Sequence, residues 1–196
     1  MKKTDKVEIF KTEINYVKDE NLRSDLKILI ELLPDYFFEV PASSTGKYHP
    51  DFALGDGGLV RHTKAAVRFA YELLSNNTVG MKFTSHDKDL IIMALTLHDG
   101  LKSGLNHDKY TKFDHPLLMS KYIMENKDKL KMSVDDIRKI CSMIESHMGE
   151  WTYDSYNKRE VLPKPKTAEQ RFVHMCDYLA SRKFIDIKFK DNDVMY

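Results

Sequence analysis

The sequence has almost no net charge, because 31 lysines and arginines are balanced by 30 aspartates and glutamates. A protein dedicated to binding long nucleic acid usually carries a strong basic excess, so this class is not expected. No apolar stretch approaches the roughly 20 residues of a membrane span, and no apolar region follows the N-terminal lysines as in a secretory signal. The two cysteines, Cys141 and Cys176, lie in apolar helical contexts, which indicates reduced, buried thiols. We therefore expect a soluble cytoplasmic protein with no disulfide framework and no membrane partner.

Most of the chain has the apolar periodicity of helices, and strand signals are weak. Helices are predicted over residues 5–17, 22–33, 59–75, 87–99, 115–126, 133–147 and 167–180. Two long polar loops interrupt them, at 40–58 and 100–113, and loops of this length in a compact domain are often functional. The predicted fold class is all-α, a helical bundle with long polar loops.

The segment Asp89–Lys102 stands out because it begins as an apolar helix and ends in His98-Asp99. The run Leu90–Leu95 leaves no polar face for water, so this helix is predicted to be central and buried. Burying a histidine and a carboxylate is costly unless something pairs with both, and a metal ion would do so. A second pair, His86-Asp87, follows Ser85 at the expected helix start, where capping residues are typical.

Further histidines and carboxylates lie in the predicted helices, mostly at ends beside the polar loops. With the central pair, the candidate metal ligands are His62, His98, Asp99, His115, His147 and Asp177. The inner faces of helices in a bundle can converge on one point. Imidazole nitrogens and carboxylate oxygens suit Fe, Mn, Ni, Co or Zn, so the expected cofactor is one or two divalent transition-metal ions.

Three motifs carry a resemblance to a known family. Residues 57–63 (GGLVRHT) resemble the entry to its first ligand helix, 98–102 (HDGLK) its defining "HD-x-x-K" motif, and 145–149 (ESHMG) a later ligand segment. The chain resembles the HD-domain superfamily of metal-dependent phosphohydrolases, most nearly the HD domain of bacterial 3′→5′ exoribonucleases and small phage or bacterial HD hydrolases. The resemblance implies an HD domain over 40–183, with N-terminal helices (1–39) packed on it and a C-terminal tail (184–196). Within the tail, the loose alternation of residues 184–189 (FIDIKF) indicates a short strand or an extended arm.

The resemblance also implies roles for the candidate residues. One metal ion would be held by His62, His98, Asp99 and Asp177. His115 and His147 would hold a second ion, with Asp99 bridging the two. Asp99 and Lys102 would be the catalytic residues, with Lys102 facing the substrate phosphate. Two alternatives remain open: His115 as a helix-start residue only, and Lys102 as a solvated lysine after a helix end.

The function implied is that of a metal-dependent phosphohydrolase or phosphodiesterase, in which metal-activated water attacks a nucleotide or a short oligonucleotide. Near-neutral charge favours a small nucleotide over an exonuclease substrate. The alternative is a non-catalytic, metal-containing regulatory module that binds a nucleotide.

Other residues are weaker candidates around the same site. His49 is a possible substrate contact, and residues 107–109 are either the mouth of a pocket or a polar surface loop. The aromatics Trp151, Tyr153 and Tyr156 either stack a base or pack a loop over the core. His174, one turn before Asp177, is expected to be a packed or supporting histidine.

Overall fold

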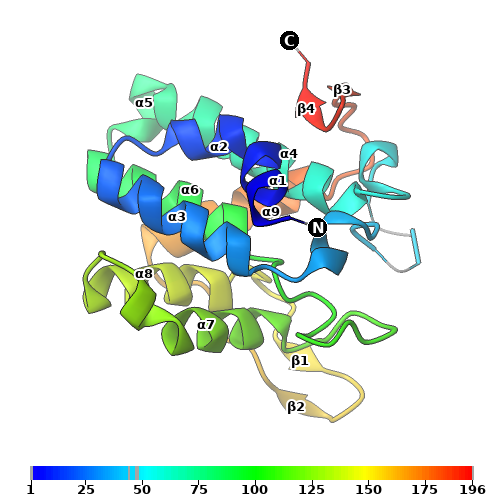
Figure 1. Cartoon of the computed structure of the whole chain (residues 1–196). Coiled ribbons are helices and arrows are strands. Elements are labelled where there is room, and N and C mark those ends of the chain that lie inside the picture. The colour runs from blue at the N-terminus through cyan, green and yellow to red at the C-terminus, as the bar shows by residue number, and fades with distance from the viewer. Residues whose placement is uncertain (1, 44, 47–48, 196) are drawn as a thin grey trace.

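The computed structural model describes residues 2–43, 45–46 and 49–195, and within them the fold is all-α apart from two small ribbons (Figure 1). The helices are α1 (Lys3–Ile9), α2 (Lys11–Tyr16), α3 (Glu20–Leu32), α4 (Gly58–Ser75), α5 (Asn77–Gly80), α6 (Ser85–Leu97), α7 (His115–Glu125), α8 (Val134–Glu145) and α9 (Ala168–Ala180). Short 3₁₀ turns lie at Asp35–Phe38, Asp51–Ala53 and Lys127–Lys129. The antiparallel strand pairs are β1 (Tyr153–Asp154) with β2 (Arg159–Glu160), and β3 (Phe189–Lys190) with β4 (Asp193–Val194).

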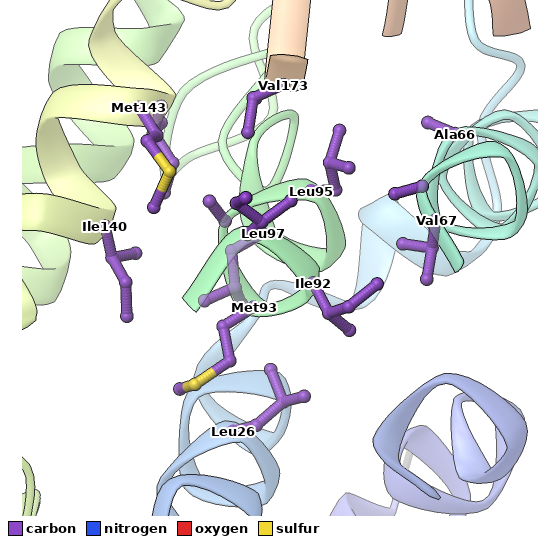
Figure 2. Close-up of a cluster of buried hydrophobic side chains, with 14 of the residues drawn as sticks. Leu26, Ala66, Val67, Ile92, Met93, Leu95, Leu97, Ile140, Met143 and Val173 are labelled. Atoms are coloured by element: carbon purple, nitrogen blue, oxygen red, sulfur yellow. The ribbon is translucent and has the colours of Figure 1, made fainter. Parts of the chain in front are cut away.

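Helix α6 is the centre of the core, as its apolar sequence predicts. Every residue from Asp89 to Leu97 is buried. Figure 2 shows Ile92, Met93 and Leu95 among side chains of α3, α4, α8 and α9. Each buried aliphatic side chain of this kind contributes about 1.5–3 kcal/mol, so the packing of four helices around α6 is the main source of stability. It also brings the ends of these helices close together.

Buried carboxylates connect the surrounding helices. Asp25 of α3 is fully buried and accepts hydrogen bonds from the backbone N–H groups of Lys131 and Met132, just before α8. Asp89 of α6 accepts from the N–H groups of Lys18 and Asp19, just before α3. Helices α7 and α8 lie side by side on the opposite flank from α2 (Figure 1). The polar contacts therefore fix how the N-terminal helices sit on α6 and α8.

The single helix predicted over residues 5–17 is wrong, because the chain breaks into α1 and α2 at Phe10. Phe10 leaves helical geometry (φ −101°, ψ 18°) and its ring packs against Phe37 and Phe38, with centroids 6.1 and 6.2 Å away. The predicted capping role of Asp87 is confirmed, although the N-cap is Thr84, one residue before Ser85. Central helix α6 ends at Leu97, so His98 and Asp99 follow it directly.

The tail forms the β3–β4 ribbon, which lies on α4 (Figure 1), and strand structure begins only at Phe189, the last residue of the predicted segment 184–189. Asp193 pairs with buried Lys64 at 2.7 Å, and the Asn192 side-chain oxygen accepts from Arg61 at 3.1 Å. Cys141 and Cys176 are buried free thiols, as expected. In the described part of the chain, no helix has the length and apolar character required to span a bilayer.

Candidate metal centre

The six candidate ligands lie in or next to helices that meet near the C-terminal end of α6. His62 lies in the second turn of α4, and His98 directly follows α6. His115 is the first residue of α7, and His147 lies two residues past α8. Asp177 points in from the last turns of α9. Because α4, α8 and α9 pack on α6, and α7 packs on α8, the structure brings the six side chains into one cluster.

Three of the histidines are oriented by the same local hydrogen bond. The Nδ1 atoms of His98, His115 and His147 each lie 2.7 Å from the backbone carbonyl oxygen three residues earlier. A carbonyl oxygen only accepts, so Nδ1 must carry the proton and donate. In the neutral ring Nε2 then keeps its lone pair, which is the arrangement of histidines that bind metals.

The first group of ligand atoms consists of His62, His98 and Asp177. Asp177 Oδ1 lies 2.9 Å from His62 Nε2 and 3.4 Å from His98 Nε2. All three ligand atoms lie within 4.8 Å of one another, which is close enough for one ion to contact them together.

The second group consists of His98, Asp99 and His147, whose ligand atoms also lie within 4.8 Å of one another, so His98 belongs to both groups. Asp99 Oδ2 faces the first group, 3.7 Å from His62 Nε2 and 3.6 Å from His98 Nε2. Its other oxygen, Oδ1, lies 3.0 Å from His115 Nε2 and 3.8 Å from His147 Nε2. The two oxygens of this carboxylate therefore point at two different sets of imidazole nitrogens.

Burial makes this cluster costly without a cation. The residues His62, His98, Asp99, His115 and His147 are each at most 2% exposed. Within the described residues, His98 Nε2 and Asp99 Oδ1 have no hydrogen-bond partner. An unpaired buried polar atom costs on the order of a few kcal/mol, and lone pairs that face each other repel. Both problems disappear when metal ions lie between these atoms, so the residues present fit such ions.

The pKa shifts in the cluster favour the protonation states in which these side chains can bind a metal ion. Burial raises the pKa of the Asp99 carboxyl, but Lys102 and His98 more than offset this and hold it well below its usual value. The pKa of Asp177 is likewise low, because the neighbouring imidazoles of His62 and His98 outweigh burial. Burial lowers the pKa of His147 to about 3, so its imidazole is neutral. The carboxylates are thus ionised at neutral pH, as metal ligands must be.

Lys102 lies at the partly open side of the cluster. Its Nζ is 2.5 Å from Asp99 Oδ2, and its side chain is 13% exposed. The alternative that Lys102 is a solvated lysine after a helix end does not describe this position. Among the six candidate ligands, Asp177 has the most exposed side chain, with 17% of its surface accessible to solvent.

Three other histidines considered in the sequence lie in different environments. His49 lies beside the cluster, its ring edge-to-face with His62 at 4.9 Å, and its Nδ1 is buried without a hydrogen-bond partner among the described residues. His107 is exposed and stacks on Tyr36, as in a polar surface loop. His174 is a supporting histidine, because its Nδ1 donates to the backbone oxygen of His147 at 2.7 Å.

Trp151, Tyr153 and Tyr156 do not form one aromatic cluster in the structure. Trp151 stacks on Tyr178, whereas no ring contact joins it to Tyr153 or Tyr156 within the described residues. Tyr178 was not among the sequence candidates, although it directly follows the ligand candidate Asp177 on α9.

Comparisons with known proteins agree with this geometry. A protein-family model described as the HD domain matches residues 59–182. Searches of curated proteins and of solved structures returned no match. The matched segment contains all six clustered residues and covers well over half of the chain. The chain therefore belongs to the HD domain family, which indicates the superfamily of metal-dependent phosphohydrolases.

Proposed function

We propose that this protein is a metal-dependent phosphohydrolase that cleaves a phosphate ester of a nucleotide or a short oligonucleotide. The observation that carries the proposal is the position of Asp99, whose two oxygens face two separate sets of imidazole nitrogens. A carboxylate in this position is suited to bridge two ions, and paired ions are typical of enzymes that act on phosphate esters.

The proposed ligand sets follow from the distances. His62, His98, Asp177 and Asp99 Oδ2 would hold one ion. His115, His147 and Asp99 Oδ1 would hold the other. Nitrogen and oxygen donors in this ratio favour Fe, Mn, Co, Ni or Zn over Ca²⁺, which prefers oxygen ligands alone.

When bound, such ions supply an activated water and polarise the phosphoryl oxygens. The chain's own residues do the rest. The Nδ1–H bonds of His98, His115 and His147 fix the imidazole planes, so the site needs little reorganisation during the reaction. Lys102, at the partly open side, is placed to offset the negative charge that develops on the phosphate. Burial of the ligands keeps bulk water away from the reacting atoms.

A small nucleotide is the favoured substrate within this proposal. The near-neutral net charge gives the chain no overall basic excess with which to hold a long phosphate backbone. A short oligonucleotide remains compatible, because its reacting phosphate would need only the metal centre and Lys102.

The test is the metal content of protein purified without chelators. We expect about two transition-metal equivalents in the wild type, about one in His115→Ala, and almost none in Asp99→Asn, which loses the bridging ligand. His86→Ala is the matched control, since His86 pairs with Asp136 at 2.7 Å on the surface and should not change the metal content.

Turnover decides between an enzyme and a binding module. We expect hydrolysis of bis-p-nitrophenyl phosphate in the presence of Mn, Fe or Ni, and its loss in Asp99→Asn. A wild-type protein that binds no transition metal even after reconstitution would refute the proposal. Full metal occupancy without turnover of any nucleotide or phosphodiester would instead support the alternative, a metal-containing module that binds a nucleotide.

A further inference from the structure

Trp151 is the only tryptophan of the chain and lies on the surface against two rings of α9, the helix that carries Asp177. Its side chain is 45% exposed although two rings hold it in place. Tyr178 stacks nearly parallel to it, with an interplanar angle of 12° and centroids 5.9 Å apart. His174 contacts it edge-on, with centroids 6.2 Å apart. A large apolar ring that is both held and exposed is the usual form of a stacking surface.

The two rings that hold Trp151 come from the elements that hold the ligands. Tyr178 is the neighbour of Asp177 on α9, and Nδ1 of His174 donates to the backbone oxygen of His147. Trp151 itself follows His147 by four residues. The stacking surface and the ligand cluster therefore share the same two segments.

Gly149 makes this arrangement possible. Its φ is +68°, a conformation that favours glycine, and the chain turns there between His147 and Trp151. A Cβ on Gly149 would lie only 2.1 Å from Cε1 of His174. The imidazole of His174 thus occupies the space left by the missing side chain and supports the indole.

A cation just past the end of α9 completes the arrangement. Arg182 Cζ lies 4.0 Å from the ring centroid of Tyr178, and its Nε donates to the Tyr178 carbonyl oxygen at 3.1 Å. The guanidinium stabilises the electron-rich face of the phenol ring and places positive charge beside the aromatic pair. Trp151 has no third ring contact within the described residues. Part of the indole therefore stays free for a ligand.

We propose that Trp151 stacks on the nucleobase of the ligand whose phosphate lies at the His/Asp cluster, with Tyr178 and His174 as positioning residues. The phosphate half of this inference rests on the proposed function. Stacking on one indole accepts purines and pyrimidines alike, because every base has a π-face. The surface thus selects a nucleotide over a sugar phosphate without reading a sequence.

The sole tryptophan provides a direct readout that does not depend on turnover. The metal-loaded protein is titrated with 5′-AMP and with ribose 5-phosphate, and indole fluorescence is excited at the red edge, where adenine does not absorb. We expect saturable quenching by 5′-AMP and little change with ribose 5-phosphate, which lacks the base. Quenching of similar size by 5′-UMP would support the tolerance for different bases.

Variants separate stacking from general damage. Calorimetry should show that Trp151→Ala binds 5′-AMP about 5- to 150-fold more weakly while its affinity for ribose 5-phosphate stays the same. Trp151→Phe, which keeps a ring, should recover much of the loss. Tyr156→Ala is the matched control, because Tyr156 is 92% exposed and has no ring contact within the described residues, so it should bind like the wild type.

The outcomes distinguish this inference from the proposed function. Equal affinity of Trp151→Ala and the wild type for 5′-AMP would overturn stacking, as would equal quenching by ribose 5-phosphate. Turnover of a phosphodiester without any quenching by 5′-AMP would also overturn stacking and leave the proposed function intact. Base-dependent quenching without turnover of any nucleotide would support stacking and refute the hydrolase.

Discussion

Replacing Gly149 by alanine tests how the support of the metal centre is built. The residue has φ +68°, and an added Cβ would lie 2.1 Å from Cε1 and 2.4 Å from Nε2 of His174. Gly55 is a matched control, because its φ is +65° and nothing lies within 4 Å of its added Cβ. The two substitutions share the backbone cost and differ in the collision with His174.

The expected magnitudes follow from these two terms. Placing an alanine in the left-handed region costs about 1–2 kcal/mol, which should be the full effect of Gly55→Ala. Overpacking a fixed neighbour adds about 1–3 kcal/mol, so Gly149→Ala should lower the free energy of unfolding by about 2–5 kcal/mol. His174 also donates to the backbone oxygen of His147, so only Gly149→Ala should weaken metal binding and turnover.

Urea denaturation of the metal-free proteins measures the stability difference, and metal titration measures the effect on the site. In a double-mutant cycle, the smaller side chain of His174→Ala should remove most of the extra cost of Gly149→Ala. The reasoning fails if both glycine variants lose the same stability, or if the cost of Gly149→Ala is unchanged in the His174→Ala background.

Three further predictions concern other parts of the chain. Asp25→Ala should lower the free energy of unfolding by about 3 kcal/mol, because it leaves the N–H groups of Lys131 and Met132 unpaired; a urea midpoint like that of the wild type would contradict this. Burial raises the pKa of the Cys141 thiol to about 11, so alkylation by iodoacetamide at pH 8 should be far slower than that of a free cysteine, and should rise with pH and with denaturant. Lys102→Met should reduce kcat for a phosphodiester by about 10²–10³-fold with metal content unchanged, and an unaltered kcat would exclude its action on phosphate.

Several features could be predicted from the sequence because they depend on neighbours along the chain. The apolar run of α6 has no polar face, so a central buried helix was the only favourable environment for it. The capping role of Asp87 depends on a side chain and a backbone N–H three residues apart, and the capping box with Thr84 is present. The HD family could be named because short motifs around His62, His98 and His147 combine residue type and spacing, and the family match agrees with it.

Other features required the tertiary structure. The break at Phe10 follows from its packing on Phe37 and Phe38, which helical periodicity within residues 5–17 does not encode. Which way a carboxylate turns depends on every group around it, so the bridging orientation of Asp99 became visible only when the helix ends were placed together.

The pairing of Trp151 with Tyr178 has the same origin. The two residues are far apart in the sequence, and no local pattern links a loop after α8 to a face of α9. Local spacing therefore determined the helices, their caps and the identity of the candidate ligands. The distances that give those ligands and the neighbouring aromatic rings a chemistry arise only from how α4, α8 and α9 pack on α6, because contacts between distant segments are set by the packing of the whole core.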